Sequence, residues 1–296
     1  MNKNTKFVEI LLPCFENGHY LRELLSSIQQ QTYPHFRLLM RDDTTSAMGA
    51  EKISAIFHEF SYHDSRFINL TEKSKHLGRL GVNENFNYLL SQSSSDTYLM
   101  FCDGDDVWPK DKVEKTLNSF LLHEGKEKRP LLTYTDLVVV DEKMNLIAKS
   151  FFSHMKINPL QNSLEDLLIT NVVTGNTVMI NQPLKNLVHP FPSQVIMYDW
   201  YMALMAKKHA SLVFLPLKTT LYRQHQDNKV GAKKRTHKKI SSIKSKIKEI
   251  KTMNLLINKE EKNFFSKKVL IKKIFSFRDK KQKAKKMALL GGMIFQ

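Results

Sequence analysis

Three carboxylates gather within four positions of this chain, directly after an apolar segment. Residues 98–108 read Tyr-Leu-Met-Phe-Cys-Asp-Gly-Asp-Asp-Val-Trp, so Asp103, Asp105 and Asp106 follow a predicted buried strand. Carboxylates this close repel one another unless a cation lies among them. Gly104 lets the backbone approach a ligand closely. The Asp103-Gly104-Asp105 part has the D-x-D spacing that suits a divalent metal ion. A structural alternative stays open at this point, because acidic turns after strands are common.

The elements that would position this cluster alternate between strands and helices. The predicted strands of the first part are 7–12, 36–40, 66–70 and 97–102, and its predicted helices are 19–30, 51–60 and 83–91. Such alternation predicts βαβ units and a mainly parallel sheet. Ligands of these sheets bind beyond the carboxyl ends of the strands. The polar segments 16–18, 42–43 and 103–106 all follow strands, so we expect them to converge on one edge.

The second part of the chain is less regular. The predicted helices are 110–122, 164–169 and 195–208, and the predicted strands are 131–140, 172–180 and 211–215. The strand at 131–140 is a candidate edge strand. No internal repeat is visible, and a domain boundary is expected near Gly231.

Length and composition suit one large α/β domain, or one domain with an appendage, since 296 residues are 42% hydrophobic. Cys14 and Cys102 both end apolar strands and are expected to be small buried hydrophobes in a reducing compartment. We see no signal peptide and no apolar run long enough to span a membrane. We therefore expect a cytoplasmic protein, with peripheral attachment to the inner face of the cell membrane as an option.

The net charge of +17 comes entirely from the C-terminal end. Residues 231–296 hold 21 Lys and Arg against four Asp and Glu, whereas residues 1–230 hold 25 of each sign. The chain is thus a neutral domain followed by a basic tail.

The tail has two interpretations. Apolar residues recur at spacings of three and four, which predicts an amphipathic helix: Ile240, Ile243, Ile247, Ile250, Met253 and Ile257. It is either a solvated helical appendage or coiled coil, or a basic helix on anionic lipid, where each Lys adds roughly 1 kcal/mol. Charge alone would permit nucleic-acid binding, but the tail lacks a recognisable motif, so we do not expect it.

Several motifs, in order over residues 7–231, together resemble family 2 glycosyltransferases with the GT-A fold, particularly the bacterial rhamnosyltransferase-like branch. The matching segments are 10–18 (Ile-Leu-Leu-Pro-Cys-Phe-Glu-Asn-Gly), 31–33 (Gln-Thr-Tyr), 41–43 (Arg-Asp-Asp), 80–87 (Leu-Gly-Val-Asn-Glu-Asn-Phe-Asn), 103–108 (Asp-Gly-Asp-Asp-Val-Trp), 174–177 (Thr-Gly-Asn-Thr), 198–200 (Tyr-Asp-Trp) and 221–225 (Leu-Tyr-Arg-Gln-His). Two positions depart from the family pattern. Phe15 replaces its usual tyrosine, and Asp43-Thr44-Thr45 replaces Asp-Gly-Ser in a nucleotide-contacting loop, which weakens the inference about the base.

The resemblance implies an α/β fold with a GT-A-type, Rossmann-like, mainly parallel sheet and flanking helices, followed by the basic helical tail. The glycosyltransferase domain would span residues 1–231, with a nucleotide-sugar-binding half at 1–110 and an acceptor-binding half at 111–231. Residues 232–296 would form the tail.

Sugar transfer needs a neutralised leaving diphosphate, a base for the acceptor hydroxyl and a held nucleotide. The resemblance implies that Asp105 ligates Mn²⁺ or Mg²⁺, which acts as a Lewis acid on the diphosphate. Asp103 would contact the ribose and the metal. Asp106 would either support these groups or cap the helix that starts near Trp108.

Asp199 is the candidate catalytic base of an inverting, single-displacement transfer, again by resemblance. Its aromatic neighbours are expected to raise its pKa and hence its basicity. The alternative for Asp199 is a helix N-cap.

The donor nucleotide has its own set of candidates. One of Asp42 and Asp43 would accept a hydrogen bond from N3–H of uracil or thymine, unless it caps the next helix instead. The other predicted contacts of the donor are Pro13, Phe15, Glu16 and Asn85. For Asn85, a plain surface position on a helix is the alternative.

Three further residues complete the predicted site. Arg223 would hold the diphosphate and His225 would complete the metal shell, although a lone His is more often structural. Trp200 would stack on the acceptor sugar, with simple packing as the alternative.

The sequence thus predicts an inverting, metal-dependent glycosyltransferase that uses a UDP- or dTDP-sugar, with rhamnose as the suggested sugar. The acceptor would be a growing surface polysaccharide on a lipid carrier. A nucleotidyltransferase is the rival enzyme, but it would show a Gly-rich phosphate loop and a basic residue where residues 13–18 have neither. A membrane- or nucleic-acid-binding adaptor on an inactive fold is the rival outside enzymes, and it would not need Asp105 or Asp199.

Overall fold

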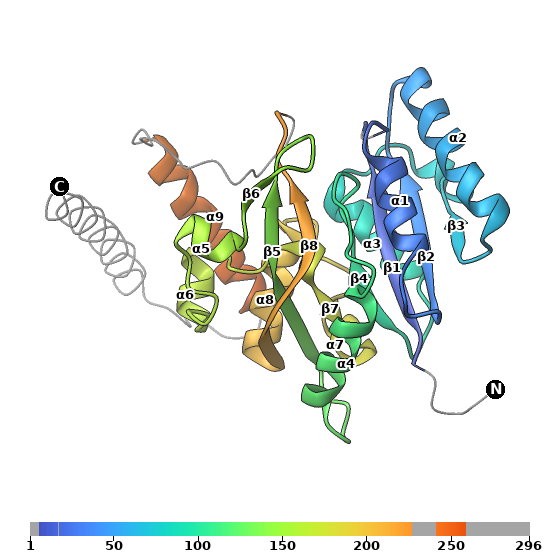
Figure 1. Ribbon diagram of the computed structural model, residues 1–296. Coiled ribbons are helices and arrows are strands. Elements are labelled where there is room, and N and C mark those ends of the chain that lie inside the picture. The colour runs from blue at the N-terminus through green and yellow to red at the C-terminus, as the bar shows by residue number, and fades with distance from the viewer. Residues whose placement is uncertain (1–5, 17, 227–240, 259–296) are drawn as a thin grey trace, which may run out of the picture.

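The computed structural model describes residues 6–16, 18–226 and 241–258 (Figure 1). Its strands are β1 Val8–Cys14, β2 Phe36–Asp42, β3 Phe67–Asn69, β4 Tyr98–Phe101, β5 Leu131–Val140, β6 Leu146–Ala148, β7 Met179–Ile180 and β8 Ser211–Arg223. Its α-helices are α1 Leu21–Gln29, α2 Ala47–His63, α3 Val82–Gln92, α4 Lys112–Glu124, α5 Phe151–Met155, α6 Leu164–Ile169, α7 Gln182–Val188, α8 Tyr198–His209 and α9 Ser241–Ile257. Two 3₁₀ turns are η1 Glu72–Leu77 and η2 Gly175–Thr177.

The strands form a single mixed sheet in the order β3-β2-β1-β4-β7-β5-β6, with β8 paired to β5. The pairs β1–β2, β1–β4, β2–β3 and β5–β8 are parallel, and the pairs that involve β6 or β7 are antiparallel. The prediction of an α/β fold with a mainly parallel sheet is confirmed. The expectation of an edge strand at β5 is wrong, because β5 pairs with β6, β7 and β8 and is buried along most of its length.

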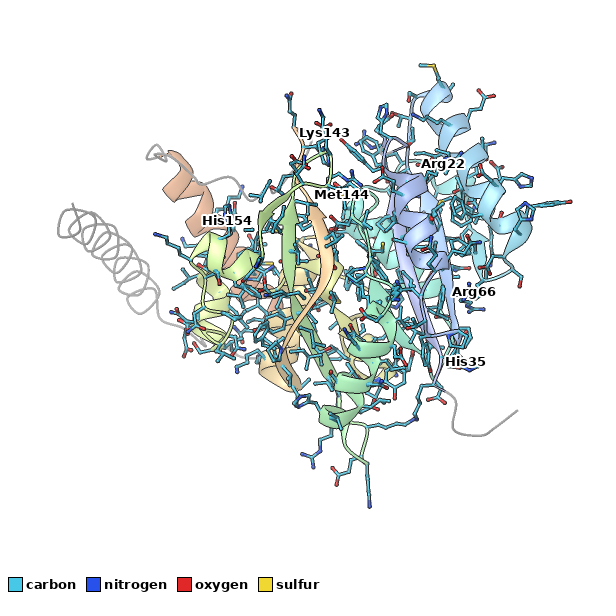
Figure 2. The ribbon with its side chains drawn as sticks, in the orientation of Figure 1. Arg22, His35, Arg66, Lys143, Met144 and His154 are labelled. Carbon is cyan, nitrogen blue, oxygen red and sulfur yellow. The ribbon has the colours of Figure 1, made fainter. Side chains whose placement is uncertain are left out.

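Helices cover both faces of the sheet, and side chains fill the space between these layers (Figure 1 and Figure 2). The alternation of side chains along each strand explains this arrangement. Along β1, Ile10 and Leu12 pack with α1, α2 and α4, whereas Leu11 packs with α3 and the helices of the second half. A strand covered on both faces must be apolar throughout, which accounts for the continuous apolar run of β1. The carboxyl edge of the sheet is left between these layers for polar groups.

The second half departs most from the sequence expectation. The strand predicted at 172–180 is mostly the turn η2 followed by the two-residue β7. A side chain at Gly175 would collide with the hydroxyl of Tyr198, since an added Cβ would lie 1.8 Å from it. The glycine therefore permits a close approach of α8 to this turn, and the turn interrupts the strand. The short elements β6, α5 and α7 were not predicted.

The first part of the tail packs on the domain. Ile250, Met253 and Ile257 of α9 are buried against α6 and α8, and Lys208 Nζ donates to the Ile257 carbonyl at 2.8 Å. The apolar side of α9 at these positions thus faces protein. Of the predicted tail at 232–296, residues 232–240 and 259–296 lie outside the described residues. Among the helices that are described, none has the length and apolarity to cross a bilayer.

Candidate active site at the carboxyl edge of the sheet

The strand ends bring the predicted polar segments to one edge, as the βαβ pattern requires. Strands β1, β2 and β4 are parallel neighbours, and β8 runs parallel to β5. Because β7 is antiparallel to both β4 and β5, the strands β4 and β5 point the same way. The segments after β1, β2, β4 and β8 therefore meet on one side of the molecule.

The acidic cluster divides into two kinds of carboxylate. Asp103 and Asp105 are partly exposed, whereas Asp106 is fully buried. Asp106 accepts hydrogen bonds from the side-chain amide of Asn176 and, at 3.1 Å, from the backbone N–H of Arg223. Helix α4 begins at Lys112 after Asp111, so Asp106 does not cap it. Asp106 instead ties the β4 loop to η2 and β8.

A buried cation, Lys112, lies beneath this cluster and was missed from the sequence. Its ammonium donates to the Asn176 carbonyl at 2.7 Å and to Thr220 Oγ1 at 2.5 Å, and lies 4.0 Å from the Trp108 ring centroid. Burial lowers its pKa to about 8, against the opposing influence of Cys102, Asp106 and Asp103. A lysine six residues after an acidic motif gives no signal by itself, because its partners come from η2 and β8.

Asp105 and His225 form a pair of side chains at this edge. His225 Nε2 lies 2.9 Å from Asp105 Oδ2, and the imidazole ring lies 4.9 Å from the ring of Tyr20. A carboxylate oxygen beside an imidazole nitrogen is a donor set that accepts Mn²⁺ or another divalent cation of intermediate softness. Within the described residues, no group of three or more His, Cys, Asp or Glu side chains is already arranged around a metal position. These two donors fit a metal whose remaining ligands come from a substrate.

Arg223 is a buried clamp within this edge. Its Nε donates to the Asp105 carbonyl at 2.9 Å and its Nη1 to the Glu142 carbonyl at 2.8 Å, while Nη2 pairs with Glu23. The guanidinium carbon also lies 4.6 Å from the centroid of the Tyr20 ring. Only 2% of the side chain is exposed. The guanidinium is therefore paired with protein groups and does not face a diphosphate. Arg223 fixes the backbone of Asp105.

Asp199 lies at the second position of α8, close enough to Asp103 for their charges to interact. Burial raises the pKa of Asp199 to about 7, although hydrogen bonds from the N–H groups of Trp200 and Gly175 oppose the shift. Burial and the carboxylates of Asp105 and Asp199 likewise raise the pKa of Asp103 to about 7. A carboxylate with such a pKa can take up a proton near neutral pH.

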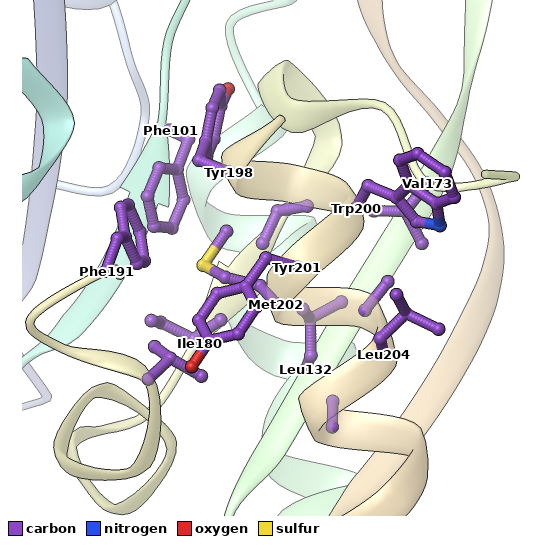
Figure 3. Close-up of a cluster of buried hydrophobic side chains, with 14 of the residues drawn as sticks. Phe101, Leu132, Val173, Ile180, Phe191, Tyr198, Trp200, Tyr201, Met202 and Leu204 are labelled. Atoms are coloured by element: carbon purple, nitrogen blue, oxygen red, sulfur yellow. The ribbon is translucent and has the colours of Figure 1, made fainter. Parts of the chain in front are cut away.

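Trp200 lies on the opposite side of α8 from Phe101 and Phe191 (Figure 3). Its side chain is 1% exposed, and its Nε1–H donates to the Leu167 carbonyl at 2.6 Å. It packs in the core with residues of β5, α6 and α8. The structure therefore supports the packing alternative for Trp200 and places no acceptor surface at its ring.

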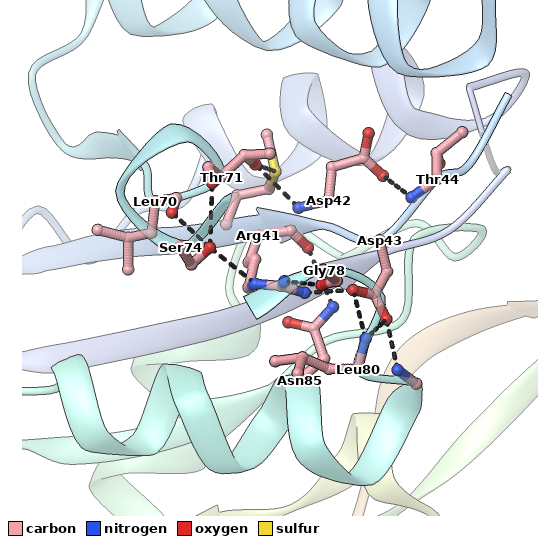
Figure 4. Close-up of polar contacts among 12 residues, drawn as sticks. Arg41, Asp42, Asp43, Thr44, Leu70, Thr71, Ser74, Gly78, Leu80 and Asn85 are labelled. Carbon is pink, nitrogen blue, oxygen red and sulfur yellow. Dashed lines mark hydrogen bonds and ion pairs between the residues drawn. The ribbon is translucent and has the colours of Figure 1, made fainter. Parts of the chain in front are cut away.

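The end of β2 forms a second polar cluster, in which the two aspartates differ (Figure 4). Asp43 is buried, pairs with Arg41, and accepts hydrogen bonds from the N–H groups of Leu80 at 3.0 Å and Gly81 at 2.5 Å. Asp42 accepts from the Thr44 N–H at 3.0 Å, and burial raises its pKa. The protein itself satisfies Asp43, which secures the start of α3.

The remaining predicted donor contacts line the neighbouring loop. Glu16 accepts hydrogen bonds from Ser46 Oγ, and its own N–H donates to Thr44 Oγ1 at 2.9 Å. The threonine that replaces the family glycine thus ties the β1 loop to the β2 loop. Pro13 and Phe15 are partly exposed beside it, and the Arg79 guanidinium lies 4.3 Å from the centroid of the Phe15 ring. Arg79 is a further candidate that the sequence reasoning missed.

Asn85 is buried, so it is not a surface position of α3. Its Nδ2 donates to the Arg41 carbonyl at 3.3 Å, and its Oδ1 has no hydrogen-bond partner among the residues that the structure describes.

The fold defines a GT-A-type α/β protein, with a group of carboxylates at the carboxyl edge of its sheet. The family model described as glycosyl transferase family 2 matches residues 9–187. The chain therefore belongs to glycosyl transferase family 2, as its motifs predicted.

Curated relatives agree with this membership. The chain is 23% identical over 151 residues to the amylovoran biosynthesis glycosyltransferase AmsB of Erwinia amylovora, covering 51% of this chain and 46% of that protein. It is 23% identical over 248 residues to the dTDP-rhamnosyl transferase RfbG of Shigella flexneri, covering 78% of each. It is 27% identical over 114 residues to WfgD of Escherichia coli, a UDP-Glc:α-D-GlcNAc-diphosphoundecaprenol β-1,3-glucosyltransferase, covering 38% of this chain and 41% of WfgD. The matched region thus spans less than half the length of two of these three relatives.

Solved structures share the fold. TarS residues 1–349 of S. aureus, in complex with UDP, is similar with a TM-score of 0.53 at 13% identity, covering 84% of this chain and 65% of that one. The mannosyltransferase PcManGT of Pyrobaculum calidifontis, in complex with GDP-Man and Mn²⁺, is similar with a TM-score of 0.50 at 14% identity, covering 72% and 56%.

Proposed function

We propose that this chain is an inverting, metal-dependent glycosyltransferase that moves a sugar from a UDP- or dTDP-activated donor to a glycan acceptor. The observation that carries the proposal is the meeting of Asp105 and His225 with Asp103 and Asp199 at one strand edge. One pair suits a cation on the leaving diphosphate, and Asp199 suits a proton acceptor.

Asp105, His225 and Asp199 would have different roles in a single-displacement reaction. A divalent cation held by Asp105 and His225 would neutralise the leaving diphosphate. The acceptor oxygen forms a bond to the anomeric carbon of the donor, while the bond from that carbon to the diphosphate breaks and its electron pair leaves with the diphosphate. The acceptor proton passes to Asp199, whose raised pKa suits this transfer. Attack from the face opposite the leaving group inverts the anomeric centre.

The donor nucleotide would lie over the loops after β1 and β2, along Pro13, Phe15 and Glu16, with the ribose near Asp103, whereas Asn85 is buried beneath them. Of the two β2 aspartates, Asp42 is the better candidate for the base contact, because Asp43 already accepts three protein hydrogen bonds. The names of RfbG and WfgD support dTDP and UDP as donor nucleotides, and the UDP complex of TarS supports the same class. Rhamnose is the sugar that the RfbG similarity favours.

The acceptor would be a surface polysaccharide under construction on a lipid carrier, a proposal that the names of AmsB and WfgD support. Residues 1–110 would serve the donor and residues 111–231 the acceptor. Peripheral attachment to an anionic membrane, with a cytoplasmic location, is the matching proposal for the enzyme and its basic tail. The apolar side of α9 packs on the domain, so a lipid contact of the described part of α9 would have to use its exposed lysines, Lys248 and Lys251.

The proposal is tested by incubating the purified full chain with UDP-, dTDP- and GDP-sugars, with Mn²⁺ or with EDTA, and measuring release of the nucleoside diphosphate. We expect hydrolysis or transfer with a UDP- or dTDP-sugar that requires the metal. Metal-independent turnover, or preference for GDP-sugars, would contradict the assignment.

A further inference from the structure

Helix α8 begins without a capping side chain of its own. The residue before it, Met197, has no side-chain oxygen, although the first N–H groups of a helix need acceptors from outside the helix. Asn83, on α3, supplies one of them. Its Oδ1 accepts from the Tyr198 N–H at 3.1 Å, and its Nδ2 donates to the Val195 carbonyl at 2.7 Å.

This contact is one residue from the candidate base. Asp199 follows Tyr198 directly, and its Oδ1 accepts from the Trp200 N–H at 2.6 Å. The carboxylate is therefore oriented by the first turn of α8. Whatever fixes that turn also fixes the distance from Asp199 to a bound acceptor.

The start of α3, next to Asn83 in the chain, is bonded to the loop after β2, on the proposed donor side of the site. Helix α3 starts at Val82, directly after Leu80 and Gly81, whose N–H groups both donate to Asp43. Two sets of hydrogen bonds, joined by the backbone of residues 81–83, thus connect the end of β2 through the start of α3 to the start of α8.

We propose that Asn83 is a positioning residue that sets Asp199 relative to the donor loops. The proposal rests on the proposed function, in which Asp199 receives the acceptor proton. Asn83 touches neither substrate in this role, and its effect reaches the reaction through the first turn of α8. Displacement of a reacting group by about 1 Å can cost on the order of 100-fold in rate, so the cap is expected to act mainly on kcat.

The chain offers a matched control one helical turn away. Asn87 is on the same face of α3, and its Oδ1 accepts from the Phe191 N–H at 2.8 Å. Both asparagines therefore hold the segment that leads into α8. Asn87 holds it eight residues before Asp199, whereas Asn83 holds it at the helix start.

The experiment compares kcat, donor KM and thermal stability of the full chain with Mn²⁺ for Asn83→Ala, Asn87→Ala and Asn83→Asp. We expect Asn83→Ala to lower kcat by about 10- to 100-fold with donor KM within about twofold, and Asn87→Ala to keep kcat within about twofold at a similar loss of stability. Asn83→Asp keeps an acceptor for the Tyr198 N–H, favoured at a helix start, and should restore part of kcat.

Asp199→Asn separates the two hypotheses. If it is inactive while Asn83→Ala and Asn87→Ala show equal kcat, the positioning role is overturned and the proposed function stands. If Asp199→Asn turns over like the wild type, the proposed function itself fails. Equal kcat in Asn83→Ala and Asn83→Asp would also overturn the role of the cap.

Discussion

Two groups of carboxylates lie at the carboxyl edge of the same sheet, and they differ in their hydrogen-bond partners and in the charges around them. At the end of β2, Asp43 is paired with Arg41 and accepts N–H bonds from the start of α3. After β4, Asp103 lies within electrostatic reach of Asp105 and Asp199, and the pKa values of Asp103 and Asp199 are raised to about 7. In the first group, Asp43 is satisfied without a ligand. The second stores unfavourable charge that a cation and a proton would relieve.

The comparison shows that neighbouring acids of one type can serve as scaffold or as reactive groups. A carboxylate such as Asp43 or Asp106 holds loops together, because it accepts hydrogen bonds from N–H groups of distant segments. A carboxylate in repulsive surroundings remains able to bind what arrives. Each of the following changes tests one side of that division.

The largest effect is expected at Asp199. Replacement by Asn keeps the size of the side chain and removes the proton acceptor, so kcat should fall by about 10²- to 10⁴-fold. Steady-state release of the nucleoside diphosphate measures it. Asp166→Asn, which changes an acid in the first turn of α6, is the matched control and should keep its rate. Retained turnover in Asp199→Asn would place Asp199 with the scaffold.

Asp43→Asn should cost stability, since it leaves the buried Arg41 without its counter-charge. Both side chains are 3% exposed, and breaking such a pair costs roughly 3 kcal/mol of unfolding free energy. Urea denaturation measures the change. The control Glu72→Gln breaks a pair that is about four-fifths exposed and should change stability by less than about 0.5 kcal/mol. A loss as small as that of the control would remove Asp43 from the scaffold.

A divalent metal ion should stabilise the folded wild type by binding at Asp105 and His225. Mn²⁺ at about 100 times its dissociation constant adds about 2.7 kcal/mol to unfolding free energy, and EDTA reverses it. Asp105→Asn and His225→Gln should lose most of this gain in urea titrations with and without Mn²⁺. Asp111→Asn removes a surface partner of Lys115 and should keep the gain. An undiminished gain in both site variants would mean that the metal binds elsewhere.

The smallest effect is a pH dependence. Asp199 must be deprotonated to accept a proton, and its pKa of about 7 means that activity rises with pH up to about 7 and levels off above it. Below that value, kcat/KM should fall about tenfold for each pH unit. A profile of the wild type with Mn²⁺ measures this. An acidic limb near pH 4 would show that the acceptor is a carboxylate with an ordinary pKa.

Much of the fold of residues 1–110 was predictable, because the apolar patterns that predict its strands and helices lie within short segments of the sequence. Short apolar runs that alternate with amphipathic helices predicted β1, β2 and β4 and the meeting of their polar ends, and the ordered motifs predicted the family. In the second half, the apolar run at 172–180 was misread as a strand. Its interruption at η2 depends on the close approach of Tyr198 to Gly175, which no local pattern contains.

The sequence by itself determined that the polar segments after β1, β2 and β4 meet at the carboxyl edge, since strand direction and βαβ order follow from apolar periodicity. Only the tertiary structure decided what each of them does there. Asp106 accepts a hydrogen bond from Asn176, 70 positions away, and Arg223 pairs with Glu23, 200 positions away. Trp200 lies in the core, where it donates to the carbonyl of Leu167. A carboxylate or guanidinium becomes scaffold when distant groups satisfy its hydrogen bonds. Those partners come together only when the sheet, η2 and α8 have packed.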